Sequence, residues 1–213
     1  MERRTLIKGI AATAACGLAS ASWRQARAAL VPLSRPIHAT GETMPVVGLG
    51  SWITFNVGED PLLLDACADV IAAFLGGGGR MIDSSPMYGS SQATIGYALK
   101  KLGNPAARFA ADKIWTSSEA DGPRQLATTR SLWGTERMDL MQVHNLLSWR
   151  AHLDMLREKK ASGEIRYIGI TTSHGRRHRE LERIMASQAI DFVQLTYNIL
   201  DREPEARLLP LAR

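Results

Sequence analysis

Cysteine is scarce in this chain of 213 residues, which contains only Cys16 and Cys67. Two isolated cysteines provide neither the spacing of metal ligands nor a disulfide framework. Cys67 follows Leu62, Leu63 and Leu64 in a helical pattern, so we expect a small, buried, apolar side chain there. The sequence therefore predicts no metal site and no disulfide-dependent fold.

Excess charge of one sign is also scarce once the first 28 residues are set aside. Those residues hold five Lys or Arg and one Glu, a net charge of +4. Residues 29–213 hold the remaining 21 basic and 20 acidic residues, a net charge of +1. The body of the protein thus lacks the basic surface of a nucleic-acid-binding protein, and we expect no nucleic-acid partner.

A long hydrophobic run is missing as well. The small apolar residues between Gly9 and Ser22 are too few and too weakly apolar to span a membrane. They follow the paired Arg3 and Arg4 and precede the small-x-small sequence Ala26-Arg27-Ala28. Residues 1–28 therefore resemble a twin-arginine signal peptide, which implies the twin-arginine translocation machinery as a partner, a periplasmic location and no stable membrane anchor.

Two other interpretations of residues 1–28 stay open. This segment could form an ordinary amphipathic helix, or it could be a lipoprotein signal that uses Cys16, although Thr13 stands where such a signal has a large apolar residue. Residues 29–43 are interpreted as a linker or arm that contains a short hairpin, because Pro32, Pro36 and Gly41 interrupt regular structure.

From Met44 onward, short apolar runs alternate with amphipathic segments. The expected strands are 46–52, Met81–Ser85, Ala111–Ser117, Asp139–His144, Ile165–Thr171 and Phe192–Tyr197; the expected helices are Pro61–Leu75, Gln92–Leu102, Pro123–Thr135, Trp149–Ser162, Arg179–Ser187 and one beginning near Pro204. Strict alternation predicts a parallel sheet covered by helices. The first helix is predicted because Leu62, Leu63, Ala66, Val70 and Phe74 recur near helical spacing.

Two α/β architectures fit this alternation, an eight-stranded βα barrel and an open doubly wound sheet. The glycine fingerprint of the open sheet is absent, because Gly48-Leu49-Gly50 lacks a third glycine and a directly following helix. Gly76–Gly79 ends a helix and precedes a strand, which is typical of a C-cap and turn rather than a phosphate loop. Polar residues recur at the ends of several strands, as in barrels, so we predict a TIM barrel.

Four of these residues form a constellation with specific chemistry. Asp83 closes the second strand, Tyr88 lies in the loop after it, Lys113 lies in the third strand and His144 closes the fourth. Neighbouring parallel strands would bring them together at one mouth of the barrel. A nearby ammonium group lowers the pKa of a phenol, a carboxylate holds the lysine, and a histidine can bind the oxygen that changes its bonding. Such a phenol could donate a proton to a carbonyl oxygen while hydride arrives from elsewhere.

The wider motifs resemble those of the aldo/keto reductases. They are Val47–Trp52, Ile82–Gly89, Lys113–Thr116, Met138–Asn145, Gly163–Ile170 and Val193–Asn198. The resemblance implies an eight-stranded barrel over residues 44–213 that reduces small aldehydes or ketones with NADPH, or with NADH. It also implies that Asp83, Tyr88, Lys113 and His144 are the catalytic tetrad, with Tyr88 as the general acid.

The same resemblance implies a set of cofactor-binding residues: Gly50, Trp52, Asn145, Thr171, Thr172, Gln194 and Tyr197. Asn145 and Gln194 would lie near the nicotinamide amide. Thr171 and Thr172 stand where the family usually has Ser-Asn, and a threonine lacks the paired donor and acceptor of an asparagine amide. Trp52, Met87 and Trp115 could line the mouth of the substrate pocket.

Arg213 falls within the sixth helix, so we expect a barrel truncated after about six βα units, either a fragment or an incomplete gene product. An active reductase is therefore the first hypothesis, and an inactive fragment or a cofactor-binding regulatory barrel is the second. A third hypothesis is an isomerase or aldolase in which Lys113 forms a Schiff base.

Overall fold

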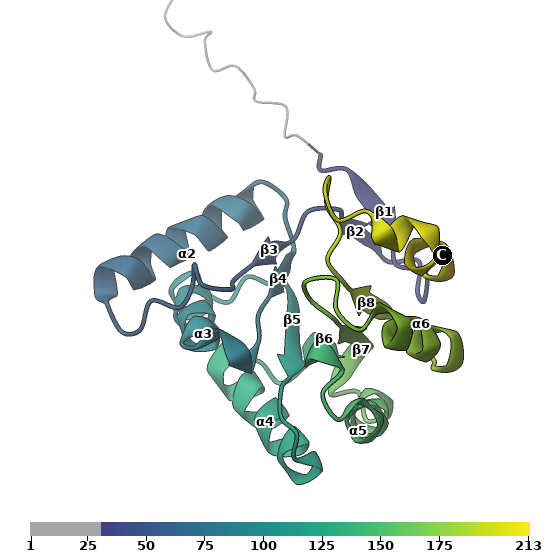
Figure 1. The fold of residues 1–213 in the computed structure, drawn as a ribbon. Helices are drawn as coiled ribbons and strands as arrows, with labels where there is room; N and C mark the ends of the chain where they lie inside the picture. The colour runs from purple at the N-terminus through teal and green to yellow at the C-terminus, as the bar shows by residue number, and fades with distance from the viewer. Residues whose placement is uncertain (1–30) are drawn as a thin grey trace, which may run out of the picture. The chain divides into compact units, whose positions relative to one another are not determined.

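The protein is described by a computed structural model that covers residues 31–213 (Figure 1). The predicted export signal, residues 1–28 with Cys16, lies outside the described residues. Within residues 31–213, no helix is both long and apolar enough to cross a membrane, and no group of three or more His, Cys, Asp or Glu could hold a metal ion.

The strands are β1 (Ser34–Pro36), β2 (Thr43–Pro45), β3 (Leu49–Gly50), β4 (Met81–Asp83), β5 (Phe109–Ile114), β6 (Met138–Val143), β7 (Ile165–Thr171) and β8 (Phe192–Gln194). The α-helices are α2 (Pro61–Gly76), α3 (Ser91–Lys101), α4 (Gly122–Trp133), α5 (Trp149–Ala161), α6 (His178–Ser187) and α7 (Leu208–Leu211). Four short 3₁₀ turns are η1 (Pro86–Tyr88), η2 (Glu119–Asp121), η3 (His144–Leu146) and η4 (Glu203–Ala206).

Strands β3 to β8 form one parallel sheet of six strands in sequence order. The sheet curls, and its connecting helices lie on the outer side (Figure 1). This confirms the predicted alternation and the curled parallel sheet, while the full eight-stranded closure is not seen in residues 31–213. The strands at both edges of the sheet were predicted too long, since β3 spans only Leu49–Gly50 and β8 spans only Phe192–Gln194, and a 3₁₀ turn precedes the short α7.

The inner face of the sheet has two zones. Side chains alternate along a strand, so Lys113 shares its face with Phe109 and Ala111. At the amino ends of the strands, Phe109 stacks on Tyr167 with ring centroids 5.9 Å apart and lies 6.2 Å from Phe192. This aromatic cluster fills one end of the sheet's concave side, which leaves the polar side chains at the carboxyl ends to form the candidate site.

The antiparallel pairing of β1 and β2 confirms the predicted short hairpin, and the hairpin packs against Phe109 at the amino end of β5. Met44 packs in the aromatic cluster, and Glu42 accepts hydrogen bonds from Arg80 Nη2 at 3.0 Å and from the Tyr167 hydroxyl at 2.9 Å. Arg166 also pairs with Glu42. The hairpin is therefore anchored by both apolar and ionic contacts.

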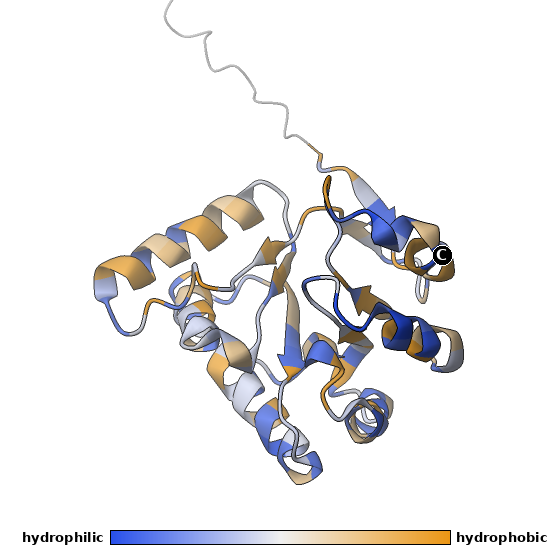
Figure 2. Cartoon of the chain, viewed as in Figure 1, coloured by the Kyte–Doolittle hydropathy of each residue, from blue (hydrophilic) through white to orange (hydrophobic). Residues whose placement is uncertain are grey.

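In helix α2 the predicted burial of Cys67 is confirmed, but most of the other apolar residues noted at helical spacing are exposed. The helix begins where Asp60 caps the backbone N–H groups of Leu62 and Leu63. Leu62 is 79% exposed and Val70 is 48% exposed, whereas Cys67 is buried. The inner face is formed by Cys67, Ala68 and Ile71, which lie on one side of the helix because positions three or four residues apart share a face. Figure 2 shows apolar colour over much of α2, which is why hydropathy alone does not identify its core face.

Candidate active site

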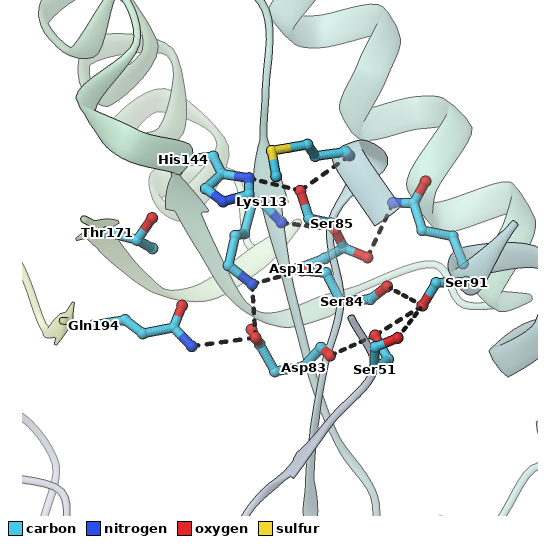
Figure 3. A network of polar contacts seen from close by, with 12 residues as sticks. Ser51, Asp83, Ser84, Ser85, Ser91, Asp112, Lys113, His144, Thr171 and Gln194 are labelled. Atoms are coloured by element: carbon cyan, nitrogen blue, oxygen red, sulfur yellow. Dashed lines mark hydrogen bonds and ion pairs between the residues drawn. The ribbon is translucent and has the colours of Figure 1, made fainter. Parts of the chain in front are cut away.

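An ion pair between Asp83 and Lys113 lies at the centre of the candidate site (Figure 3). Asp83 ends β4, and the parallel register aligns it with Ala111, two residues before Lys113 on β5. Lys113 Nζ donates to Asp83 Oδ2 at 2.6 Å and to the Ser84 carbonyl oxygen at 2.7 Å. Lys113 is only 1% exposed, so this charged pair is shielded from water. Asp83 holds the lysine, as the sequence predicted.

Tyr88 is brought above this pair by the turn η1. Pro86 begins the turn, and the Ser85 side chain caps it by accepting a hydrogen bond from the Met87 backbone N–H at 3.1 Å. Lys113 Nζ lies 5.2 Å from the centroid of the Tyr88 ring. The short turn thus places the phenol next to the buried ammonium group.

The sequence predicted a lowered pKa for Tyr88, and this was wrong in net direction. Burial of the hydroxyl raises its pKa above the ordinary value, and this effect outweighs the lowering by the Lys113 charge, while the Asp83 charge raises the pKa further. Tyr88 therefore keeps its proton at neutral pH, and the lysine offsets part of the cost of losing it.

His144 completes the group of four. It directly follows β6, and its ring meets the Tyr88 ring edge-on with centroids 5.7 Å apart. Burial, and then the positive charge of Lys113, lowers the pKa of His144 to about 4. The histidine is therefore neutral at pH 7 and carries a single N–H. Its Nδ1 lies 2.7 Å from Ser85 Oγ (Figure 3).

The neighbouring residue Asp112 was not singled out by the sequence analysis. It faces away from Lys113, is fully buried, and accepts hydrogen bonds from Gln92 Nε2 at 3.0 Å, Trp133 Nε1 at 2.8 Å and the Lys113 backbone N–H at 2.7 Å. Burial raises its pKa to about 6 despite these donors. The sequence did contain a signal for this residue. Side chains alternate between the two faces of a strand, so the residue next to Lys113 points outward, under the helices, where a carboxylate is unusual.

Three serines, which the sequence did not mark as part of the site, fix the path of the chain around Asp83. Ser51 Oγ donates to the Asp83 carbonyl oxygen at 2.8 Å, and Ser91 Oγ donates to Ser51 Oγ at 2.7 Å. Ser84 Oγ lies 3.0 Å from Ser91 Oγ. These buried contacts tie β3, β4 and the start of α3 together (Figure 3).

Three of the predicted cofactor-binding residues lie next to the tetrad. Gln194 Nε2 donates to Asp83 Oδ2 at 3.2 Å, and Gln194 pairs with Thr171 across β7 and β8. The Asn145 backbone N–H donates to Thr171 Oγ1 at 3.1 Å. Two strands and the turn after His144 therefore converge on one side of the ion pair.

The other four predicted cofactor-binding residues are Gly50, Thr172, Trp52 and Tyr197. Gly50 pairs with Asp83 in the sheet, and the Thr172 backbone N–H donates to the Gln194 carbonyl oxygen at 2.9 Å. Trp52 is 52% exposed and meets His174 edge-on with ring centroids 6.5 Å apart. The Tyr197 hydroxyl instead donates to Glu205 Oε1 at 2.7 Å.

Neither Trp52 nor Tyr197 joins the tetrad through a described contact. Trp52 follows the two-residue strand β3, and Tyr197 lies beyond the end of β8, so both are on the connecting segments outside the sheet. Strand register therefore does not direct these side chains toward the ion pair.

A cavity of about 710 Å³ lies at the opposite ends of the strands, lined by residues including Ile37, Met44, Met81 and Phe192. It carries none of the tetrad residues. The titratable groups at the carboxyl ends, rather than the size of this hollow, identify the candidate active site.

The sequence profile of the aldo/keto reductase family matches residues 46–213, which include all four tetrad positions. The chain belongs to the aldo/keto reductase family. This aldo/keto reductase is similar to the NADH-specific methylglyoxal reductase of Escherichia coli (strain K12), with 28% identity over 216 residues that cover 84% of this chain and 63% of the relative. The chain thus spans less than two thirds of the length of that curated relative.

Solved structures agree with the fold. A thermostable aldo-keto reductase in complex with the inhibitor epalrestat matches with a TM-score of 0.68 and 27% identity, over 83% of this chain and 67% of that chain. An aldo/keto reductase from Klebsiella pneumoniae, in complex with NADP and acetate, matches with a TM-score of 0.69 over 84% of this chain and 64% of that chain. Its identity is only 20%, so it supports the fold alone.

Proposed function

We propose that this aldo/keto reductase reduces a small aldehyde or ketone by hydride transfer from NADPH, with Tyr88 as the general acid. The observation that carries the proposal is the meeting of four groups from three βα units. Lys113 Nζ lies 2.6 Å from Asp83 and 5.2 Å from the Tyr88 ring centroid, and the Tyr88 ring abuts the neutral His144. This set suits proton transfer to an oxygen atom.

The amide side chains beside the tetrad fit a nicotinamide. Within residues 31–213, the Asn145 Oδ1 accepts from Ser173 and the Gln194 Nε2 donates to Asp83, while Asn145 Nδ2 and Gln194 Oε1 form no hydrogen bond. One donor and one acceptor are therefore free to bind the carboxamide of a nicotinamide ring. When bound there, the reduced nicotinamide would supply the hydride.

Each member of the tetrad then has a separate role. His144 donates a hydrogen bond to the carbonyl oxygen and orients it. As the carbonyl carbon accepts the hydride, its oxygen takes the proton of the Tyr88 hydroxyl, so the product is an alcohol and Tyr88 becomes a phenolate. The Lys113 ammonium stabilises that phenolate, and Asp83 keeps Lys113 in place. A proton from solvent restores the Tyr88 hydroxyl.

The cofactor preference is a finer proposal. We propose NADPH as the cofactor. NADH is the alternative, because the E. coli relative is named as NADH-specific. The same relative is described as a methylglyoxal reductase, so small dicarbonyl compounds are the first substrates to test.

The reaction can be followed by isotope transfer. The full chain is incubated with methylglyoxal and with NADPH or NADH deuterated at the transferred position, and the product is analysed by mass spectrometry and NMR. The proposal predicts one deuterium on the alcohol carbon. Cofactor oxidation without deuterium at that carbon, or no alcohol with either cofactor, would refute it.

A second candidate is a barrel that binds the cofactor without turnover, because the amide groups of Asn145 and Gln194 could hold a nicotinamide whether or not Tyr88 transfers a proton. Tight binding of NADPH, measured by fluorescence, without any alcohol product would support this alternative. The Schiff-base hypothesis is not favoured. Lys113 Nζ donates to both Asp83 and Ser84 and is nearly inaccessible, so it does not present a free amine.

We also propose export through the twin-arginine pathway, on the basis of Arg3, Arg4 and the sequence Ala26-Arg27-Ala28. Fusing residues 1–35 to an export reporter should give a periplasmic signal that is lost when Arg3 and Arg4 are both replaced by Lys. The matched control is Arg24→Lys, which keeps the pair intact. A signal that survives the double replacement would contradict the proposal.

A further inference from the structure

Ser85 is a fully buried residue that contacts His144 from the same turn that carries Tyr88. Its Oγ lies 2.7 Å from His144 Nδ1 and 3.1 Å from the backbone nitrogen of Met87. Figure 3 shows both contacts converging on the one serine oxygen. Ser85 is thus bonded to one member of the tetrad and lies three residues before another.

The hydrogen atoms available at this junction determine the direction of each bond. The Met87 N–H can only donate, so it occupies a lone pair of Ser85 Oγ. The serine has one hydroxyl hydrogen, and within residues 31–213 its oxygen has no partner other than Met87 and His144. If His144 Nδ1 also donated, the serine hydrogen would be buried without an acceptor, which is costly. The favourable arrangement is therefore Ser85 O–H donating to Nδ1.

The charge state of His144 leaves only one ring hydrogen to assign. Burial and the nearby Lys113 ammonium keep the ring neutral at pH 7, since its pKa falls to about 4. With Nδ1 accepting from Ser85, the single hydrogen must reside on Nε2. No hydrogen bond engages Nε2 within the described residues, so this N–H remains available to a ligand.

We propose that Ser85 is a positioning residue that holds His144 as the Nε2–H tautomer, so that the histidine can donate to the carbonyl oxygen that Tyr88 protonates. The assignment of the tautomer depends on the contacts of Ser85 and on the neutrality of His144. Its consequence for turnover rests on the proposed carbonyl reduction.

Ser84 provides a matched control, because it is the adjacent serine and is equally buried. Its hydroxyl contacts Ser91 Oγ at 3.0 Å and not His144. Ser84→Ala therefore removes a buried hydroxyl from the same segment without touching the histidine. Ser85→Thr is the conservative variant, because it retains the hydroxyl.

The tautomer can be read directly from ¹⁵N-histidine NMR of the full chain near pH 7. The chain has five histidines, so the His144 signals are assigned by their loss in His144→Gln. We expect the wild-type protein, Ser84→Ala and Ser85→Thr to show a protonated Nε2 and an acceptor-type Nδ1. In Ser85→Ala we expect a shift toward the Nδ1–H form or a mixture. A protonated Nδ1 in the wild-type protein, or an unchanged His144 signature in Ser85→Ala, would overturn the proposal.

Kinetics provide the second measurement. Loss of one hydrogen bond should lower kcat of Ser85→Ala by roughly tenfold, with recovery in Ser85→Thr and little change in KM for the cofactor. A spectrum that changes as expected in a protein without reductase activity would retain the tautomer assignment and refute the proposed function. Full kcat in Ser85→Ala, together with an altered tautomer, would refute the link to turnover.

Discussion

Breaking the Asp83–Lys113 pair should reveal a strong energetic coupling between two groups of the candidate site. Lys113 is 1% exposed and the Asp83 side chain is 14% exposed. Removing one partner of a shielded pair leaves the other charge buried, which costs about 3–5 kcal/mol. Lys113→Met also leaves the Ser84 carbonyl oxygen without its donor, but Gln194 still donates to Asp83 at 3.2 Å. We therefore expect a loss near the lower end, about 3 kcal/mol.

The assay is a double-mutant cycle by equilibrium unfolding in urea at pH 7. Asp83→Asn should also destabilise by about 3 kcal/mol, because it leaves the ammonium group unpaired. The double variant should cost far less than the two single changes added together, with a coupling of about 2–3 kcal/mol.

The matched control is Lys101→Met. Lys101 pairs with Asp65 at 2.5 Å on the surface, where both side chains are nearly half exposed. Solvent screening makes such pairs weak, so we expect little change in stability. Strict additivity in the cycle, or a Lys113→Met variant as stable as the control, would refute the argument that burial makes this pair strong.

For three further variants, the structure predicts the direction of the change in stability. His144 has a folded pKa of about 4, below its ordinary 6.5, so it contributes stability that is present above pH 6.5 and lost as pH falls toward 4, up to roughly 3 kcal/mol. Asp112 has a folded pKa of about 6, above its ordinary 3.8, so its contribution is present below pH 4 and lost as pH rises through 6. These shifts can be tested by urea midpoints measured from pH 4 to pH 7. As pH rises, the midpoint of His144→Gln should fall relative to that of the wild type, and the midpoint of Asp112→Asn should rise relative to that of the wild type. Parallel curves for all three proteins would contradict both pKa shifts. Gly96→Ala should destabilise the protein by more than about 2 kcal/mol, because a Cβ there would overlap the Leu132 carbonyl oxygen of α4. A thermal melt that is unchanged in Gly96→Ala would show that α3 and α4 are not packed this closely.

The sequence predicted those features that follow from periodicity. Alternating strands and helices have different hydrophobic periods, so their order was correct, and β7 was bounded correctly. Asp83, Lys113 and His144 recur about one βα unit apart, so parallel register brought them together as expected.

Features that depend on facing surfaces could not be derived in this way. The buried face of α2 includes Ala68 and Ile71, which depends on the elements that the helix meets, and the tight contact at Gly96 depends on a carbonyl oxygen of another helix. Asp112 and Ser85 gain their importance from partners far away in the chain, Trp133 and His144. The sign of the Tyr88 pKa shift was missed for the same reason, since burial is a property of the assembled site.

The most direct test of the central proposal compares Tyr88→Phe with Tyr97→Phe. Tyr97 is a matched control, because its hydroxyl donates to Asp65 at 2.5 Å on the surface. With methylglyoxal and the preferred cofactor, Tyr88→Phe should lower kcat by about 10²–10⁴-fold while cofactor binding is retained. Tyr97→Phe should keep the wild-type kcat. Turnover by Tyr88→Phe at the rate of Tyr97→Phe would contradict the assignment of Tyr88 as the proton donor.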